Sequence, residues 1–344
     1  MAKTNPGRFF EDYSVGQVIR HAVPRTVSGG ERALYHALYP ARHALYSSDA
    51  FAQQCGLPNA PLDDLIAFHT VFGKTVPDIS LNAVANLGYA EGRWHRPVWP
   101  GDTLRSESEV IGLKQNSNGK SGVVWVRTRG LNQRDEVVLD YVRWVMVRKR
   151  NLDAPAPETV IPELSASVAA GDLVVPDVLN FTGYDFTLAG EPHRLGDYDT
   201  GEVIDHVDGV TIEEAEHMQA TRLWQNTAKV HFDATFREDG KRLIYGGHVI
   251  SMARALSFNG LANAQMIVGL NAGAHANPCF SGDTVKAWSE VLDKVETGAP
   301  GVGAIRLRLV AIKAGGEVGV LKGDDGKYLP HVLLDLDYWA LMPV

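Results

Sequence analysis

The chain has 344 residues, a formal net charge of −8 and 22% charged residues, which is ordinary for a globular protein. No segment is dominated by Lys and Arg, so we expect no nucleic-acid partner. No apolar run approaches the ~18 residues of a membrane-spanning helix, so we expect no membrane partner. The segment MAKTNPGRFFEDY lacks the apolar core of a signal peptide, and no targeting tag is present, so a cytoplasmic location is expected.

A long internal repeat is the dominant pattern. Asp12 and His21 recur as Asp197 and His206, at a constant offset of 185 (197 − 12 and 206 − 21). A period of this length is far too long for a solenoid and corresponds to a whole domain plus a connector. The sequence therefore predicts two copies of one fold, which form a pseudo-dimer within one chain.

The repeat divides the chain into three segments. The first unit covers residues 8–150, and the second covers residues 194–344. Residues 151–193 between them are rich in Pro and Ala and are predicted to form a connector. Its later part, residues 173–193, could form an extra strand or a wrapped arm.

The first unit combines a helical pattern with strand patterns. Leu65, Phe68 and Phe72 are spaced as on one face of a helix. Residues 123–129 alternate between apolar and polar side chains, as a strand does. Residues 137–147, VVLDYVRWVMV, form a nearly continuous apolar run, which is typical of a strand buried on both faces.

The second unit has the same order of elements. Val249, Met252 and Leu256 mark one face of a helix that is entered after Gly246 and Gly247, and residues 304–312 alternate as a strand. Long helices beside antiparallel strands indicate an α+β fold. In each half, a long central helix wrapped by a curved antiparallel sheet would bury both apolar faces.

A Gly-Asp-Thr phrase precedes one strand in each copy. Residues 97–110 recur as residues 278–291, at an offset of 278 − 97 = 181. Glycine permits a positive φ, and aspartate accepts hydrogen bonds from nearby backbone. Asp102 and Asp283 are therefore predicted to shape turns and to have an architectural role.

The differences between the copies locate the candidate chemistry. Polar, titratable or backbone-permissive residues stand in the second copy where the first has apolar or aromatic ones, namely Asn226 for Ala41, His231 for Tyr46 and Gly247 for Leu62. These differences predict that the second half is catalytic and that the first half shapes a pocket.

Each of these residue types suits a definite task. His231 can move protons near neutral pH. Gly246 and Gly247 open a predicted helix, where free backbone N–H groups and the helix dipole favour a developing oxyanion. Cys55 and Cys279 are the only cysteines, and His231 has no partner at metal-ligand spacing, so no metal site is expected. No glycine-rich dinucleotide turn is present, so no redox cofactor is expected.

At these residues the chain resembles the MaoC-like hydratases of the hotdog superfamily. The resemblance lies in QNTAKVHFDATF (225–236), IYGGHVISMARAL (244–256) and RPVWPGDTL (96–104), and it covers both units. It implies a tandem, or double, hotdog fold. It also implies that His231 and the residue at position 226 hold the water that adds to a 2-enoyl thioester.

Two positions depart from the family pattern. Asn226 stands where the family has aspartate, and Gly246 stands where the family has the histidine of a His-Gly pair. An amide cannot act as a base. Either His231 alone activates water while Asn226 orients it, or a carboxylate elsewhere completes the pair. The nearby carboxylates in the sequence are Asp208, Glu213, Glu216 and Asp233, and for Asp233 a local capping role is expected.

The whole chain, including ALYHALYPARHALYSSDAFA (33–52), is similar to one branch of these hydratases. The resemblance implies reversible dehydration of β-methylmalyl-CoA to mesaconyl-C1-CoA, by syn addition and elimination of water, in C2 assimilation or CO2 fixation. CoA would be part of the substrate, no other cofactor would be needed, and two chains would form a homodimer.

Such a substrate carries a free carboxylate, which needs a cation when it is buried. The candidates are Arg222, Lys229 and Arg254 in the second half and Arg42 in the first. Three alternative functions remain open at this point. The chain could hydrate another 2-enoyl-CoA, hydrolyse an acyl-CoA as a thioesterase, or bind acyl-CoA without catalysis.

Overall fold

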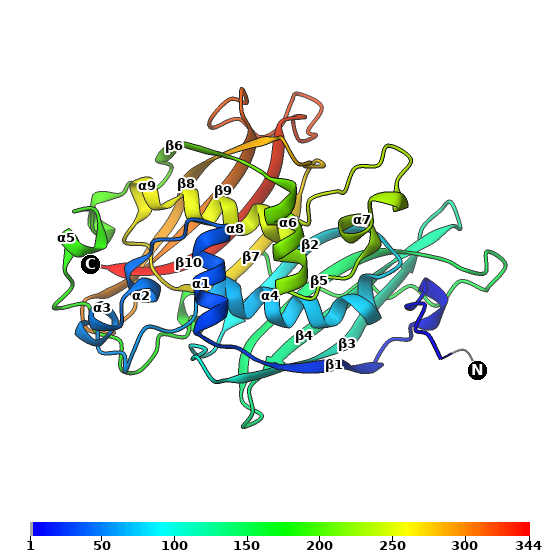
Figure 1. Cartoon of the computed structure of the whole chain (residues 1–344), viewed down its shortest axis with the longest axis horizontal. Coiled ribbons are helices and arrows are strands. Elements are labelled where there is room, and N and C mark those ends of the chain that lie inside the picture. The colour runs from blue at the N-terminus through cyan, green and yellow to red at the C-terminus, as the bar shows by residue number, and fades with distance from the viewer. Residues whose placement is uncertain (1–2) are drawn as a thin grey trace.

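The computed structural model describes residues 3–344, which build one ten-stranded antiparallel sheet with helices on one face (Figure 1). The strand order is β1-β3-β4-β5-β2-β7-β10-β9-β8-β6. The first five strands belong to the first half of the chain and the last five to the second. The order in one half mirrors that in the other, so a pseudo-twofold axis runs between β2 and β7.

The first half contains the elements η1 (Phe10–Asp12), β1 (Val18–Thr26), α1 (Gly29–Leu38), α2 (Ala44–Ser47), α3 (Asp49–Gln54), α4 (Asp64–Thr75), η2 (Val76–Ser80), β2 (Ala83–Trp94), β3 (Thr103–Gln115), β4 (Ser121–Leu131) and β5 (Val137–Arg148). Two short helices, η3 (Ala170–Asp172) and α5 (Phe186–Ala189), lie in the connector. The connector adds no strand to the sheet, and its single backbone bridge joins Val160 to Leu113 on β3.

The second half repeats this order with η4 (Leu195–Asp197), β6 (Val203–Thr211), α6 (Glu214–Leu223), α7 (Lys229–Phe232), η5 (Ala234–Phe236), α8 (Gly246–Leu256), α9 (Phe258–Leu261), β7 (Ile267–His275), β8 (Thr284–Glu296), β9 (Val302–Lys313) and β10 (Val332–Pro343). The two halves join where β2 pairs with β7, with Tyr89 opposite Gly273 and Arg93 opposite Gly269. This pairing is called the seam below.

The long helices α4 and α8 pack against the sheet (Figure 1). Helix α4 contacts β3, and helix α8 contacts β8 and β9. Asp63 caps α4 by accepting a hydrogen bond from the Leu65 N–H at 2.9 Å. Nearly all residues of both helices are buried, as a helix between a sheet and other helices must be. The predicted α+β plan, a helix on a curved antiparallel sheet in each half, is confirmed. Within residues 3–344, no helix has the length and apolar character needed to cross a membrane.

The residues that the two copies share are structural. The Nε2 atom of His21 on β1 lies 2.8 Å from the Ser108 hydroxyl on β3, and His206 on β6 makes the same contact with Ser289 on β8. Both histidines are buried. Each histidine therefore links the edge strand to its neighbour through a buried hydrogen bond.

The two Gly-Asp-Thr phrases form the predicted turns. Asp102 accepts a hydrogen bond from the Trp99 N–H at 2.8 Å, and Asp283 accepts one from the Phe280 N–H at 2.9 Å. Gly101 precedes Asp102 with φ of +103°, a conformation that favours glycine. The architectural prediction for both aspartates is confirmed.

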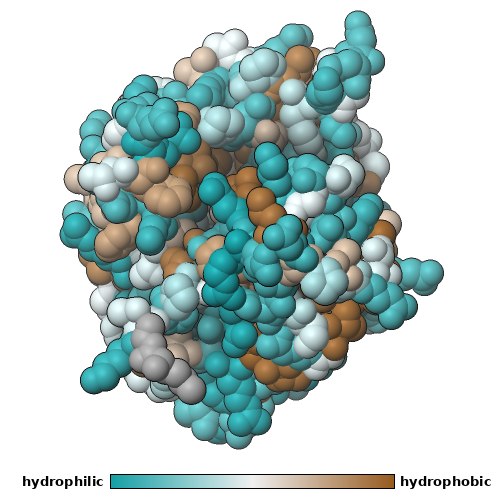
Figure 2. Space-filling view, turned by 90° about the vertical axis from the view of Figure 1, so that its right-hand side faces the viewer, coloured by the Kyte–Doolittle hydropathy of each residue, from teal (hydrophilic) through white to brown (hydrophobic). Residues whose placement is uncertain are grey.

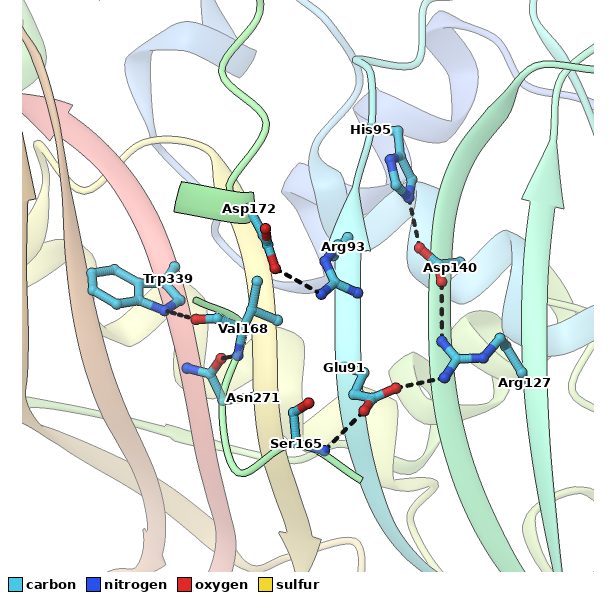
Figure 3. Close-up of polar contacts among 10 residues, drawn as sticks. All are labelled: Glu91, Arg93, His95, Arg127, Asp140, Ser165, Val168, Asp172, Asn271 and Trp339. Atoms are coloured by element: carbon cyan, nitrogen blue, oxygen red, sulfur yellow. Dashed lines mark hydrogen bonds and ion pairs between the residues drawn. The ribbon is translucent and has the colours of Figure 1, made fainter. Parts of the chain in front are cut away.

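The connector crosses the outer face of the sheet at the seam (Figure 3). Glu91 on β2 accepts a hydrogen bond from the Ser165 N–H at 2.8 Å, and Asn271 on β7 accepts one from the Val168 N–H at 2.7 Å. The indole N–H of Trp339 donates to the Val168 carbonyl at 3.2 Å. This part of the connector thus ties strands of both halves together. Residues 173–193 form no strand, and the N–H groups of Asn180 and Phe181 donate to the Cys55 and Pro300 carbonyls at 2.9 Å, so this later part is a wrapped arm that contacts both halves.

Candidate active site

A cavity of about 320 Å³ lies between the two halves and contains most of the predicted site residues. The second half contributes Asn226, Lys229, His231, Gly246 and Gly247. The first half contributes residues of α4, η2, β2 and β5, so both halves build this site. Exposed Val84 and Lys229 line its rim. Figure 2 shows the end of the molecule on the right of Figure 1, where the surface is mostly hydrophilic with separate hydrophobic patches.

His231 on α7 is held in one tautomer. Its Nδ1 lies 2.7 Å from the Leu243 carbonyl oxygen, which can only accept, so Nδ1 carries the hydrogen. The lone pair of Nε2 is then available for a ligand. Burial lowers the pKa of this half-buried imidazole from 6.5 to about 4. His231 is therefore neutral at neutral pH, the form that can accept a proton.

Asn226 lies between α6 and α7 with 3% of its surface exposed. Its Oδ1 accepts a long hydrogen bond of 3.3 Å from the Ala228 N–H, and its own N–H donates to the Thr221 carbonyl at 2.9 Å. Among residues 3–344, no acceptor takes a hydrogen bond from the side-chain Nδ2. The amide can therefore orient a water molecule beside His231, although it cannot accept its proton.

Gly246 and Gly247 form the first turn of α8. The preceding residue, Tyr245, occupies the N-cap position and makes no side-chain capping bond, so the first N–H groups of α8 are left for a ligand. A Cβ atom on Gly246 would lie 2.2 Å from Cε1 of His275, and one on Gly247 would lie 2.3 Å from the Tyr245 ring. Close packing thus requires glycine at both positions and keeps backbone N–H groups at the cavity wall.

A polar network buried in the core fixes the start of α8. Tyr245 donates its backbone N–H to Nε2 of His217 at 3.0 Å, and its hydroxyl lies 2.8 Å from Nδ1 of His69. Nε2 of His69 in turn lies 2.7 Å from the Ser251 hydroxyl on α8. These contacts join α4, α6 and α8, so both halves hold the two glycines in place.

Asp233, one of the carboxylates near His231 in the sequence, caps η5. Its side chain accepts hydrogen bonds from the Thr235 N–H and hydroxyl at 2.9 and 2.7 Å. The local capping role expected for Asp233 is confirmed. Asp208, Glu213 and Glu216 do not line the cavity. Within the part of the chain that the structure describes, no carboxylate lines it together with His231.

Three of the four predicted carboxylate-binding cations lie elsewhere, so this prediction needs correction. Arg254 is buried outside the cavity, where Nη1 donates to His43 Nε2 at 2.6 Å. Arg42 packs on the Phe258 ring, with Cζ 4.4 Å from its centroid, and Arg222 is exposed outside the cavity. Sequence spacing along a helix did not show which face meets the cavity. Lys229 does line it.

Several cavity residues were missed by the sequence analysis, among them two with basic side chains. Nε2 of His275 at the end of β7 lies 3.2 Å from the Tyr89 hydroxyl on β2, across the seam. The repeat could have revealed His275, because the offset of 181 places it on Trp94 in the first copy (275 − 94 = 181). The second missed residue is Arg143 on β5, which lines the cavity and is fully buried. It sits in an apolar run that indicated only a buried strand.

The equivalent space in the first half is filled by protein. Tyr46 on α2 replaces His231 on α7, and its hydroxyl donates a hydrogen bond to Oδ2 of Asp64. The same Asp64 oxygen accepts the Ile267 N–H at 2.7 Å, and burial raises the pKa of this carboxyl to about 8. A phenol and a protonated carboxyl thus close the space that stays open in the second half.

The structure also corrects the residue matched to Gly247. The hydrogen bond from Leu62 N–H to the Val98 carbonyl has its equivalent in Ile244 N–H to Cys279. The offset at the long helices is therefore 244 − 62 = 182, and Gly247 corresponds to Leu65 rather than to Leu62. A gap of three residues before the helix accounts for the difference.

Comparison with known proteins agrees with this architecture. A MaoC domain protein dehydratase from Chloroflexus aurantiacus has a solved structure that covers 100% of this chain and 99% of its own, with 57% identity and a TM-score of 0.97. A Mycobacterium tuberculosis protein with a double hotdog fold covers 98% of both chains at 24% identity, with a TM-score of 0.76, which shows the fold alone. The chain is thus a double-hotdog protein of the MaoC-like class.

Sequence comparison is more specific. The profile of the mesaconyl-CoA hydratase family matches residues 1–323. A mesaconyl-CoA hydratase from Cereibacter sphaeroides is 79% identical over 341 residues, 99% of each chain. A β-methylmalyl-CoA dehydratase from Chloroflexus aurantiacus is 58% identical over 347 aligned residues, again 99% of each chain. The chain belongs to the mesaconyl-CoA hydratase family.

Proposed function

We propose that the chain is a hydro-lyase that interconverts β-methylmalyl-CoA and mesaconyl-C1-CoA, with CoA entering only as part of the substrate. The names of its relatives describe the two directions of this reaction, hydration and dehydration. The observation that carries the proposal at the level of atoms is the neutral His231, whose Nδ1 is committed to Leu243 while its Nε2 is available in the cavity.

In the hydration direction, the thioester carbonyl would accept a hydrogen bond from a free N–H of the first turn of α8, at Gly247. This contact polarises the conjugated alkene and stabilises the enolate that forms. Water, oriented by Asn226, adds its oxygen to the β-carbon while Nε2 of His231 takes the proton. The imidazolium then returns a proton to the α-carbon. Water and proton arrive from one face, so addition is syn and no net charge is produced.

The decisive test is His231→Ala. Loss of the proton-transfer group should lower kcat by about 10²–10⁴-fold while the protein stays folded. Absorbance of the conjugated thioester, followed by product identification, measures the rate. His193→Ala is the matched control, because His193 is exposed and outside the cavity. Near-wild-type turnover of the His231→Ala enzyme would show that His231 is not the proton-transfer group.

The alternatives are separated by the same assays. A thioesterase would release free CoA thiol from the substrate, and a hydratase for unbranched substrates would prefer crotonyl-CoA. A binding protein would turn over none of them. The open His231 lone pair and the uncapped start of α8 favour catalysis over binding alone.

Two finer expectations belong to the same proposal, namely a cytoplasmic location and a homodimer of chains. The dimer rests on the family resemblance, and the location rests on the sequence features described above. Light scattering coupled to size-exclusion chromatography tests the dimer, and fractionation of cells tests the location.

A further inference from the structure

Arg143 is a buried cation without a charged partner. It projects from β5 toward α4, where Nη2 donates to the Thr75 hydroxyl at 2.8 Å and Cζ lies 4.3 Å from the Phe72 ring centroid. Within residues 3–344, neither Nε nor Nη1 has a hydrogen-bond partner, and no carboxylate lies within ion-pairing distance. The side chain is 0% exposed and lines the cavity that holds His231.

An arrangement of this kind is unfavourable in the empty protein. Arginine remains charged even when burial lowers its pKa, because its ordinary value is so high. An unpaired buried charge is strongly destabilising, and an anion that enters the cavity would offset that cost. A ligand carboxylate would also supply acceptors for the donors of Nε and Nη1.

A second unpartnered side chain lines the same cavity. Both Nδ2 and Oδ1 of Asn86 on β2 are buried and lack partners among residues 3–344. Strand β2 is paired with β5, and Tyr89 lies opposite Arg143 in that register. Two donor atoms of a guanidinium and both polar atoms of an amide, from adjacent strands, therefore lack partners at one wall of the cavity.

The pseudo-symmetry of the molecule provides an internal comparison. The offsets of 254 − 72 = 182 and 338 − 143 = 195 match Arg254 with Phe72 and Tyr338 with Arg143. In both halves a guanidinium thus faces an aromatic ring between a long helix and the equivalent strand, with helix and strand roles exchanged.

The two guanidinium groups differ in what surrounds them. Arg254 donates to His43 Nε2 at 2.6 Å, to the Ser257 hydroxyl at 3.1 Å and to the Gln265 carbonyl at 3.0 Å. Beside Tyr46 and Asp64, where the equivalent space is filled, protein atoms therefore occupy the donors of Arg254. At the open cavity, Nε and Nη1 of Arg143 are left for a ligand.

We propose that Arg143, assisted by Asn86, binds the free carboxylate of a dicarboxylic 2-enoyl thioester and makes the enzyme specific for it. The inference rests on the proposed hydratase function. In mesaconyl-C1-CoA the carboxylate is attached to the carbon that receives the water oxygen. Arg143 on β5 and the start of α8 would then hold opposite ends of one acyl group, and the reacting carbon would be placed beside His231.

The test compares two substrates that differ in one group. Tigloyl-CoA has the carbon skeleton of mesaconyl-C1-CoA with a methyl group in place of the carboxylate. Arg143→Met should lower kcat/KM for mesaconyl-C1-CoA by at least about 100-fold, through the lost charge-assisted contact, and leave kcat/KM for tigloyl-CoA unchanged or raised. Arg222→Gln, which removes an exposed arginine outside the cavity, should change neither value.

Binding of inert thioesters gives a readout independent of turnover. Calorimetry of the wild-type protein should show succinyl-CoA binding at least about 10-fold more tightly than butyryl-CoA, and Arg143→Met should abolish the difference. Because the charge is unpaired, Arg143→Met should melt at the same or a higher temperature, whereas Arg254→Met, which leaves buried acceptors without donors, should melt lower.

The outcomes separate this inference from the proposed function. A wild-type enzyme that does not hydrate mesaconyl-C1-CoA overturns the proposed function. A wild-type enzyme that hydrates it while Arg143→Met does so equally well overturns the inference alone. Equal wild-type affinity for succinyl-CoA and butyryl-CoA, or failure of Arg143→Met to fold, also overturns it, because both contradict an uncommitted cation that faces the cavity.

Discussion

Gly246 at the start of α8 lies against His275 at the end of β7, so close that a Cβ on Gly246 would fall 2.2 Å from Cε1 of the imidazole. Nε2 of the same His275 ring lies 3.2 Å from the hydroxyl of Tyr89, which belongs to the other half. The helix start that presents free N–H groups is therefore set by a histidine that also spans the seam. This contact leaves no room for a side chain at position 246.

Gly246→Ala should disturb both the proposed oxyanion site and the seam. The added methyl group cannot fit without moving His275 or α8, so we expect the free energy of unfolding to fall by about 1–3 kcal/mol and kcat to fall by at least tenfold. Urea unfolding and the hydration assay measure the two effects. Gly196→Ala is the control, because a Cβ there meets no heavy atom within 4 Å. A Gly246→Ala enzyme with unchanged stability and unchanged kcat would contradict the close contact between Gly246 and His275.

Asn226→Asp should weaken hydration of the dicarboxylic substrate. A carboxylate at this buried position would repel the carboxylate of mesaconyl-C1-CoA, whereas an amide does not. We expect kcat/KM for mesaconyl-C1-CoA to fall by about tenfold or more, with a smaller effect on tigloyl-CoA.

Asn180→Asp is a suitable control for that substitution. Asn180 makes the same kind of local contact, in which Oδ1 accepts the Thr182 N–H at 2.9 Å, but it lies outside the cavity. Equal or greater activity of Asn226→Asp on mesaconyl-C1-CoA would refute the idea that an aspartate at position 226 repels the substrate carboxylate.

The protein should lose stability as the pH falls from about 6.5 toward 4. Burial lowers the pKa of six histidines from 6.5 to about 3 or 4, namely His69, His206, His217, His231, His248 and His275. Below pH 6.5 the unfolded chain binds protons at these sites and the folded chain does not, so protonation favours unfolding.

Two buried carboxyls act in the opposite direction. Burial raises the pKa of Asp63 to about 6 and that of Asp64 to about 8, so the folded state holds protons there that the unfolded state releases. The pKa values of His36 and His43 are also lowered by burial, and that of Glu191 is raised by burial. Eight histidines against three carboxyls leave the histidines dominant, so urea midpoints should fall as the pH is lowered from 6.5 to 5. Midpoints that rise over this interval would show that the histidines are not buried in the neutral form.

The pH dependence of activity follows from the lowered pKa of His231. Because its pKa is about 4, the imidazole stays neutral well below pH 6.5, and activity lost in mild acid should track unfolding rather than protonation of the base.

Much of this could be inferred from the sequence. The offset of 185 between His21 and His206 showed two copies, and the contrast between Tyr46 and His231 showed which copy is open. These inferences succeed because a duplicated fold places equivalent residues in equivalent surroundings, so a difference between copies reports a difference in role. The same comparison, extended to position 275, would have found a further cavity residue.

The proposed carboxylate-binding cation could not be inferred in this way. Arg143 and Arg254 both lie in apolar stretches, and their sequence contexts do not show that the first has unpaired donors and the second has none. That distinction depends on which carbonyls and side chains approach from elements far away in the chain. The sequence alone determined the duplication and the fold and pointed to His231 as the candidate base, because these follow from the periodic pattern within each copy and from the comparison between the copies. The tertiary structure alone decided which buried charge is left without a partner, because pairing in the core is set by packing between distant segments.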